Sequence, residues 1–311
     1  MSSKNIFKVS ALTLTMMGVF TTLLAQAQAD EAEALMNPTS TVEVEAIGVN
    51  TSSAKFGEYN GLNKQGGYLN GNLNIRGGDG YKKNSEGDTT RWTVYGTDLG
   101  LSDRSAGANI SNQGEWSVGI GYDALTHNMA DTYQTPYRGT MGGSSFTLAP
   151  GFGGGVGNNV QTVKGATAST LNSSLPLFQT QDISSTRQNT LLNGSVIIDK
   201  NWSASFDYNH LNQSGAKLGA AATSSYGTSP LVANQATSIL PMPTNYQTDT
   251  LNMAINWKDE KSHFTASYFG SFFQDATNSV SFQPWSVGTS GTNVLNPGMQ
   301  TLTTAPNNQF Q

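Results

Sequence analysis

Three histidines are the residues of this chain best suited to catalysis or metal binding. His127, His210 and His263 are far apart in the sequence, and no spacing typical of a metal site or of a Ser/His/Asp triad joins them. There is no cysteine, which excludes disulfides, thiolate ligands and covalent attachment of c-type haem to this chain. We therefore expect no catalytic residue, no cofactor-binding residue and no metal ligand, and we do not expect an enzyme.

A glycine-rich run, Gly151–Gly157, is the other stretch that could suggest ligand chemistry. It is not a phosphate-binding loop, because no GK[ST] sequence and no expected helix follow it. We interpret it as a flexible part of a long loop.

The composition describes the scaffold that carries these residues. Charged residues make up 12% of the chain and apolar residues only 36%, with a mean hydropathy of −0.35. Asn, Ser, Thr and Gly replace the missing charge. Disorder is disfavoured, because disordered chains are highly charged and poor in aromatic residues. The composition favours a β-rich protein with one apolar and one uncharged polar face. Its acidic balance, a net charge of −5, argues against a nucleic-acid partner.

The N-terminus indicates export. Lys4 and Lys8 precede an apolar stretch, and Ala27-Gln28-Ala29 resembles a cleavage site. We expect residues 1–29 to be a signal peptide and residues 30–40 to be a periplasmic segment.

Alternation with a period of two residues dominates the chain after residue 40. Between Glu115 and Asp123, apolar and aromatic side chains alternate with small or polar ones. Each such run covers about 8–11 residues, long enough to cross a bilayer as a tilted strand. We expect nine strands, near residues 41–50, 66–77, 90–99, 104–111, 115–123, 202–209, 250–257 and 263–272, with one more before a turn at 199–201.

Short and long connections alternate from residue 112 onward, as they do in outer-membrane barrels. Residues 41–311 are accordingly expected to form part of a transmembrane antiparallel β-barrel of the outer-membrane type, all-β and incomplete, with about nine or ten strands of a larger barrel. The long outer loops are expected at about 124–186, 211–246 and 274–311. A tenth strand near Val280–Val287 is an alternative that Pro284 argues against, and no strand is expected at Asn307–Gln311. An odd strand count would leave an open edge, so we interpret the chain as an N-terminal fragment.

Tryptophans indicate which end of each strand is periplasmic. Counted along the expected strands, four of them fall at the end with the short turns, and Tyr122, Tyr208 and Phe272 fall near the other end. Aromatic belts at both interfaces are typical of membrane barrels. The predicted periplasmic-side girdle consists of Trp92, Trp116, Trp202 and Trp257. The alternative is a soluble β-sandwich, which would not sort tryptophan to one edge.

Four segments together are characteristic of one family. They are Asn37–Val44, Ser53–Asn63, Arg91–Leu101 and Asp131–Tyr137. They resemble the MtrB/PioB family of decahaem-associated outer-membrane proteins. The resemblance implies a wide barrel that sheathes a periplasmic decahaem c-type cytochrome, often presenting it to an extracellular multihaem cytochrome or terminal reductase. Some members carry a Cys-x-x-Cys near the mature N-terminus, and this chain has none. The haems would belong to the partner cytochrome.

The polar phase of the strands is the expected lumen surface, suited to docking another protein because its side chains are small and uncharged. A generic polar lumen, as in a general diffusion porin or a substrate transporter, is the alternative. The proposed partner-facing residues are Asn70, Asn72, Asn74, Ser117, Gly119, Gly121, Ser203, Ser205, Asn209, Asn252 and Asn256, and the same phase includes Thr250, Thr265 and Ser267. The expected location is the outer membrane of a Gram-negative bacterium, in contact with its lipid.

Overall fold

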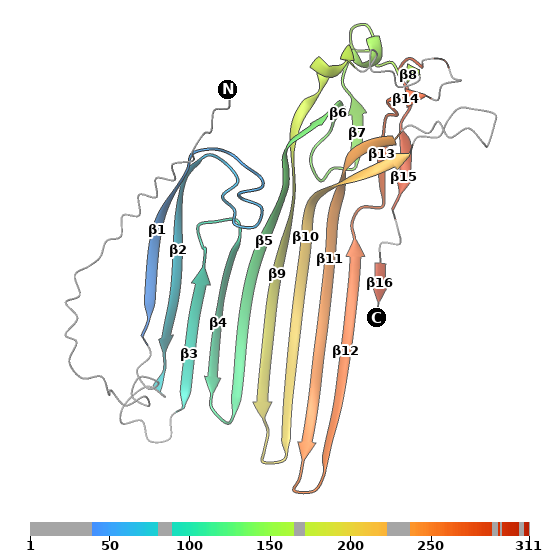
Figure 1. Ribbon diagram of the computed structural model, residues 1–311. Helices are drawn as coiled ribbons and strands as arrows, with labels where there is room; N and C mark the ends of the chain where they lie inside the picture. The colour runs from blue at the N-terminus through green and yellow to red at the C-terminus, as the bar shows by residue number, and fades with distance from the viewer. Residues whose placement is uncertain are drawn as a thin grey trace. The chain divides into compact units, whose positions relative to one another are not determined.

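The computed structural model describes residues 39–79, 89–164, 172–222, 237–287, 292, 294–304 and 308–310. The expected signal peptide (1–29) and most of the expected periplasmic segment (30–40) lie outside these residues. The described chain is almost entirely β, and its main element is a ten-stranded antiparallel sheet in which neighbours follow the sequence order (Figure 1). The predicted fold class, part of an outer-membrane β-barrel, is confirmed. The strands of this sheet, in order, are β1 (Thr41–Val49), β2 (Gly66–Gly77), β3 (Thr90–Thr97), β4 (Arg104–Asn112), β5 (Trp116–Thr135), β9 (Gln179–Ile197), β10 (Trp202–Ala222), β11 (Thr237–Lys258), β12 (His263–Asp275) and β16 (Asn308–Phe310).

Three connections at one end of this sheet are tight, namely β4–β5, β9–β10 and β11–β12. The β4–β5 turn uses Gly114 at φ 88°, a left-handed conformation that favours glycine. In the β9–β10 turn, the Asp199 carboxylate accepts hydrogen bonds from the backbone N–H groups of Asn201 and Trp202, at 2.7 and 2.8 Å. We call this end the inner end and the opposite one the outer end.

Register divides the sheet into two chemically distinct faces. Directly paired residues in an antiparallel sheet point to the same side. One row of pairs joins Val94, Ala108, Ile120 and Leu192, and the adjacent residues on these strands point to the opposite side. We call the first side the apolar face and the other the polar face. A period of two residues therefore separates the faces, as the alternation predicted.

The central strands are much longer than the sequence pattern indicated. β5, β9, β10 and β11 have 20, 19, 21 and 22 residues, whereas β3 and β4 have 8 and 9. The expected loop bounds 124–186 and 211–246 were therefore wrong, because β5 continues to Thr135 and β10 to Ala222. The backbone ladder continues there without apolar–polar alternation.

Two prolines lie in the outer part of β11 without disrupting the strand. Pro241 and Pro243 lie opposite Leu218 and Ala216 of β10, above the point where β12 stops pairing with β11 at Tyr246. The carbonyl of Asn245 points to the β12 side, since it accepts the N–H of Ala276 at 2.9 Å. Residues 241 and 243 share that orientation, so each proline removes an N–H that would face an unpaired edge.

The expected loops contain a folded unit, which we call the outer cap. It comprises β6 (Tyr137–Arg138), β7 (Ser145–Leu148), β8 (Val163–Lys164), β13 (Ser279–Phe282), β14 (Ser286–Val287), β15 (Gln300–Thr303) and the 3-10 turns η2 (Phe152–Gly154) and η3 (Leu175–Leu177). The alternative strand at Val280–Val287 thus forms β13 and β14, which join the cap and not the main sheet. The prediction of no strand at Asn307–Gln311 was wrong, because β16 pairs with β12 through Phe272, Phe273 and Gln274.

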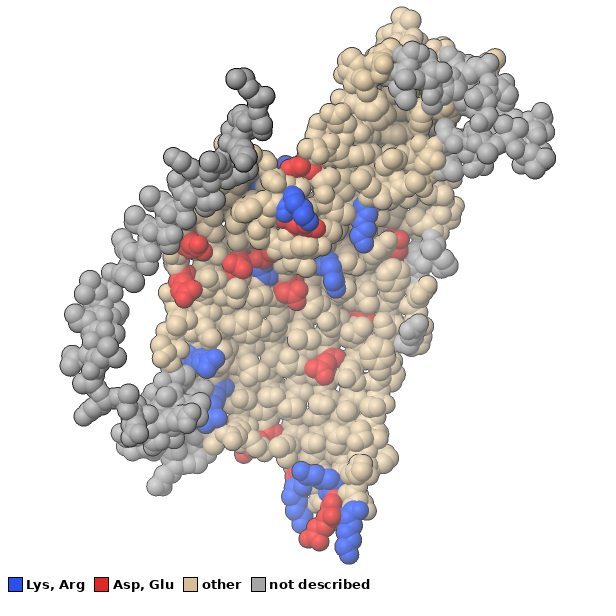
Figure 2. All heavy atoms as spheres, in the orientation of Figure 1, with Lys and Arg blue, Asp and Glu red and all other residues tan. Residues whose placement is uncertain are grey.

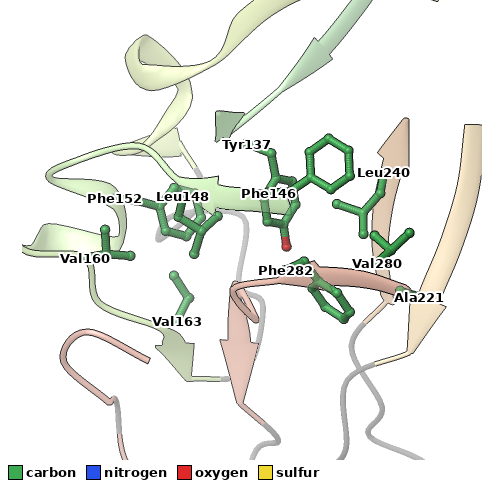
Figure 3. Close-up of a cluster of buried hydrophobic side chains, with 10 residues drawn as sticks. All are labelled: Tyr137, Phe146, Leu148, Phe152, Val160, Val163, Ala221, Leu240, Val280 and Phe282. Carbon is green, nitrogen blue, oxygen red and sulfur yellow. The ribbon is translucent and has the colours of Figure 1, made fainter. Parts of the chain in front are cut away.

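The cap has the only large cluster of buried apolar side chains that the described residues form (Figure 3). Phe152, which lies inside the glycine-rich run, is fully buried, and Gly151, Gly153 and Gly154 around it adopt positive φ. The flexible-loop interpretation of this run was therefore wrong, since its glycines form a tight turn that places Phe152 in a core. The cluster consists of Tyr137, Phe146, Leu148, Phe152, Val160, Val163, Ala221, Leu240, Val280 and Phe282.

The connection between β1 and β2 protects an otherwise open edge of β5. Pairing of β5 with β4 ends at Ala124, so the backbone of β5 beyond that residue has no strand on that side. There, the N–H of Thr126 donates to the carboxylate of Asp103, in the β3–β4 connection, at 2.6 Å, and the N–H of Asn128 donates to the carbonyl of Glu58, in the β1–β2 connection, at 3.0 Å. Covering an edge in this way prevents unwanted strand pairing. We call residues 51–65 the clasp.

Side chains also hold the clasp in place. Buried Asn128 donates from Nδ2 to the carbonyl of Gly57 at 2.8 Å and accepts a bond from Asn63 Nδ2 at 3.1 Å. Tyr59 stacks on His127 with ring centroids 4.5 Å apart. The clasp contains the Ser53–Asn63 segment of the family resemblance, and these contacts give that segment a structural role.

Candidate partner-facing surface

The structure places all eleven predicted partner-facing residues on the polar face. Their register pairs show this directly, for example Gly119 with Asn193 and Asn209 with Thr250. Most of these side chains are half-buried or exposed. Their role in contacting a partner stays a prediction, but a single continuous surface carries them.

Several of the eleven already have a structural role within the chain. Asn70 is only 5% exposed and donates to the Asp98 carboxylate at 2.8 Å, while Asn72 accepts the N–H of Asp98 at 2.8 Å. Both therefore fix the β3–β4 turn, in which Asp98 adopts φ 55°. Gly119 and Gly121 leave room for neighbours. A Cβ at Gly119 would lie 2.8 Å from Asn193 Oδ1, and one at Gly121 would lie 3.5 Å from Tyr95 Oη.

Charged residues on the same face were missed. On the face shown in Figure 2, charged groups gather at the hairpin tips and over the outer part, with few between them. Within each strand, side chains an even number of residues apart point to the same face. This spacing from the predicted residues could have identified the charged ones. Both signs of charge occur among them. The strand residues concerned are Glu43, Glu45, Arg76, Arg91, Asp123, Arg187 and Asp207.

The opposite face is built for an apolar solvent. Large apolar side chains are exposed on it, among them Val44 at 80% and Ile120 at 55%. A shallow hollow of ≈ 720 Å³ lies between Trp116, Phe206 and Tyr268, over the small residues Gly194 and Ala204. A Cβ at Gly194 would lie 2.5 Å from the Phe206 ring, so this glycine lets an aromatic ring lie flat on the sheet.

All four predicted girdle tryptophans lie on the apolar face, near the inner end of their strands. Trp202 pairs directly with Trp257, and their ring centroids are 6.5 Å apart. Trp116 lies level with Ala204, two residues beyond Trp202, and Trp92 lies level with Val118, two residues beyond Trp116. Two residues are about 7 Å along a strand and two strand spacings are about 10 Å, so this line slopes by about 35°. Membrane barrels tilt their strands by this amount, which favours the girdle prediction.

The apolar face becomes polar toward the outer end. His210 Nδ1 lies 2.7 Å from the Asp249 carboxylate, which also accepts the hydroxyl of Tyr208 at 2.6 Å. Tyr208 lies level with Leu192 and Leu251 in register, and His210 and Asp249 lie two residues further out. An apolar band bounded by tryptophans at one end and by this polar group at the other has the polarity profile of a bilayer-spanning surface.

Ion pairs concentrate in the clasp. Lys55 hydrogen-bonds to Glu58, and His127 Nε2 lies 3.3 Å from the other Glu58 oxygen. The Lys55 ammonium, with a smaller effect of His127, holds the pKa of Glu58 below its usual range. Among the described residues, no three His, Asp or Glu side chains come together as metal ligands. Within the same ranges, no helix combines the length and apolarity needed to cross a membrane.

Comparison with known proteins agrees with this geometry. A family model described as "Putative outer membrane beta-barrel porin, MtrB/PioB" matches residues 49–311. The chain is 22% identical over 253 residues to "Outer membrane protein MtrB" of Shewanella baltica (strain OS185). That alignment covers 80% of this chain and 32% of the relative, so the chain spans about a third of the relative's length. An open sheet with one lipid-compatible and one polar face is what a section of such a barrel wall requires, and this chain belongs to the MtrB/PioB family of outer-membrane β-barrel proteins.

Proposed function

We propose that this chain forms part of a barrel wall that encloses a periplasmic multihaem c-type cytochrome. The assembly would support electron transfer across the outer membrane to extracellular acceptors, an extracellular multihaem cytochrome or a surface reductase. The observation that carries the proposal is the wide polar face of small side chains behind an apolar face, in a chain of the MtrB/PioB family. The chain itself is proposed to bind no haem and to catalyse no reaction.

The physical need for such a wall is electrostatic. An ion in the hydrocarbon of a membrane carries a solvation cost of order 20 kcal/mol, so charge does not cross about 30 Å of lipid unaided. A chain of haems can conduct electrons over this distance when protein replaces the lipid around it. The wall needs an apolar exterior and an interior that accepts another protein, and no redox group of its own.

The size of the polar face is adequate for a stable protein interface. Nine strand spacings across the ten-stranded sheet amount to about 43 Å. Over a membrane depth of about 25 Å, the face offers roughly 1,000 Å², whereas each partner in a typical stable complex buries about 800 Å².

A diffusion porin or substrate transporter is the second candidate. The scattered charges of the polar face favour it to some degree, since a hydrated lumen tolerates Asp123, Arg187 and Asp207 without a partner. A hollow on this face between Asp123, Arg187 and Thr250 is also polar.

Purification of the natural full-length protein from its native membrane separates the two. A sheath should co-purify with a haem-stained c-type cytochrome in near-equal amount, and its deletion should abolish reduction of extracellular acceptors. A colourless barrel that conducts ions freely in planar bilayers would overturn the proposal in favour of the porin.

A further inference from the structure

The hollow of the apolar face interrupts two rows of mostly large side chains. Register places five residues in the first row, across β5, β9, β10, β11 and β12: Trp116, Val196, Ala204, Ile255 and Ala266. The next row outward, on the same strands, is Val118, Gly194, Phe206, Met253 and Tyr268. Ala204, Ala266 and Gly194 are the small members of these rows, and all three line the hollow of ≈ 720 Å³.

The hollow begins next to the tryptophan girdle. One row further in, Trp202 pairs with Trp257, and Trp257 pairs with Phe264. Two residues along the strand, or about 7 Å, separate this row from Ala204. Interfacial tryptophans lie at the level of the lipid headgroups, and the hydrocarbon of one leaflet is about 15 Å deep. The two rows of the hollow therefore lie at the depth of the acyl chains of the leaflet at the inner end.

Charged residues of both signs lie at the two hairpin tips beside the girdle (Figure 2). The tips adjoin, since the N–H of Lys258 donates to the carbonyl of Asn201 at 2.8 Å and Asn201 Nδ2 donates to the carbonyl of Lys258 at 2.6 Å. Within the described part of the chain, no ion pair joins the charged groups of the tips to one another. These groups are Lys200, Lys258 and Lys261, with Asp199, Asp259 and Glu260. Cations and anions are therefore both available to a ligand at this end.

The two features select a ligand with an apolar chain and a charged head. An acyl chain gains no hydrophobic free energy by leaving the bilayer for the hollow, because lipid tails are as apolar as these side chains. Retention must come from closer packing in the hollow and from polar contacts of the headgroup. Ammonium groups suit a phosphate, and carboxylates suit an amine. A zwitterionic phospholipid carries both of these groups.

We propose that the hollow and the two hairpin tips together bind one glycerophospholipid with a phosphatidylethanolamine headgroup, from the leaflet at the inner end. An acyl chain lies in the hollow beside Trp116 and Tyr268, and the phosphate lies at Lys200 and Lys258. The site requires only a membrane-embedded wall, so it does not depend on whether the barrel encloses a protein.

Filling the hollow tests this site in the natural full-length protein, extracted in mild detergent. Ala204→Phe should lose one phosphatidylethanolamine per barrel relative to the wild type, measured by native mass spectrometry and by lipid phosphate. Ala46→Phe is the matched control, because Ala46 lies on the apolar face of β1, pairs with Leu69 and does not line the hollow. It should retain the wild-type amount. Equal retention in the two variants would overturn the proposal.

The headgroup contacts are tested separately. The double variant Lys200→Ala/Lys258→Ala should reduce the retained phosphatidylethanolamine several-fold, because the phosphate loses its ammonium partners. Lys217→Ala removes an exposed lysine from the outer part of β10 and should change nothing. A loss that is equal in both cases would mean that the hairpin tips make no specific contact.

Cross-linking of the wild-type protein keeps the test decisive if Ala204→Phe does not fold. Phosphatidylethanolamine with a photoreactive group in its acyl chain should label Trp116, Ala204 and Tyr268 several-fold more than Val44, which is 80% exposed on the same face. Uniform labelling of the apolar face would overturn the site. Wild-type protein that retains no phospholipid, or only lipopolysaccharide, would overturn it as well.

Discussion

The barrel wall and the outer cap bury their apolar side chains in different ways. In the cap, Phe146, Phe152 and Phe282 are at most 2% exposed and belong to one cluster of buried apolar side chains. In the wall, side chains of similar polarity such as Ile120 and Met253 are 55% and 42% exposed. The cap completes its own core, as soluble domains do, whereas the wall supplies one layer and depends on lipid for the second.

This difference shows that the same sheet extends from lipid into water. Within the apolar band, side chains alternate between lipid and lumen. Beyond Tyr208 and Asp249, apolar residues such as Leu218 and Leu240 no longer alternate regularly with polar residues along β10 and β11. The cap then packs against this extension through Ala221 and Leu240.

The largest expected effect comes from opening the cap core. Phe282→Ala should destabilise the cap by about 3–5 kcal/mol, the usual cost of deleting a buried phenyl ring. Protease added to intact cells should then cut the cap while the wall stays folded. Phe269→Ala is the control, because Phe269 is 62% exposed on the polar face, and it should leave the cap resistant. Equal protease sensitivity of the two variants would contradict the distinction between the regions.

A charge on each face of one strand tests the wall itself. Met253→Arg places a guanidinium on the apolar face and should cost about 2–4 kcal/mol of folding free energy. Asn252→Arg, on the adjacent residue and the opposite face, should cost much less. The folded fraction in lipid vesicles, read from heat-modifiable gel mobility, measures both. If Asn252→Arg proves the more damaging of the two, our assignment of the faces is reversed.

The smallest effect concerns the clasp, which joins the short strands to the long ones. Because the pKa of Glu58 is lowered in the folded chain, the stability it contributes is present above the ordinary glutamate range and is lost as pH falls through the lowered value. Hydrogen exchange of residues 53–63 should therefore accelerate below about pH 4, beyond the intrinsic pH effect. Glu58→Gln should remove this acceleration, and its persistence in that variant would exclude Glu58 as the cause.

Much of the wall could be predicted from the sequence. The contrast between lipid on one face and a polar interior on the other produces an alternation of apolar and polar residues that reveals the strands. The strands holding Trp116 and Trp202 and the parity of their faces follow from this pattern. The outer halves of β10 and β11 could not be recognised, since apolar and polar residues do not alternate regularly there. The cap was missed because it depends on short pairings between distant residues, such as Ser145 with Ser281 in a parallel arrangement.

The face on which the candidate residues lie could be predicted, but the contacts that each of them makes could not. Sequence reasoning placed Asn70 and Ser205 on the same face, and the structure agrees. The commitment of Asn70 to Asp98 depends on how the β3–β4 turn folds back onto β2, which no local pattern reveals. The register between strands also decides which of these residues lie side by side, such as Ser117 and Ser195.

The unequal strand lengths have a consequence for access. β4 begins opposite Ala124, whereas β5 continues to Thr135, a further eleven residues or about 37 Å along the strand. The outer edge of the sheet is therefore much lower at β4 than at β5, and the clasp lies at this step. Molecules approaching from the outer side therefore meet a taller wall over β5–β11 than over β1–β4.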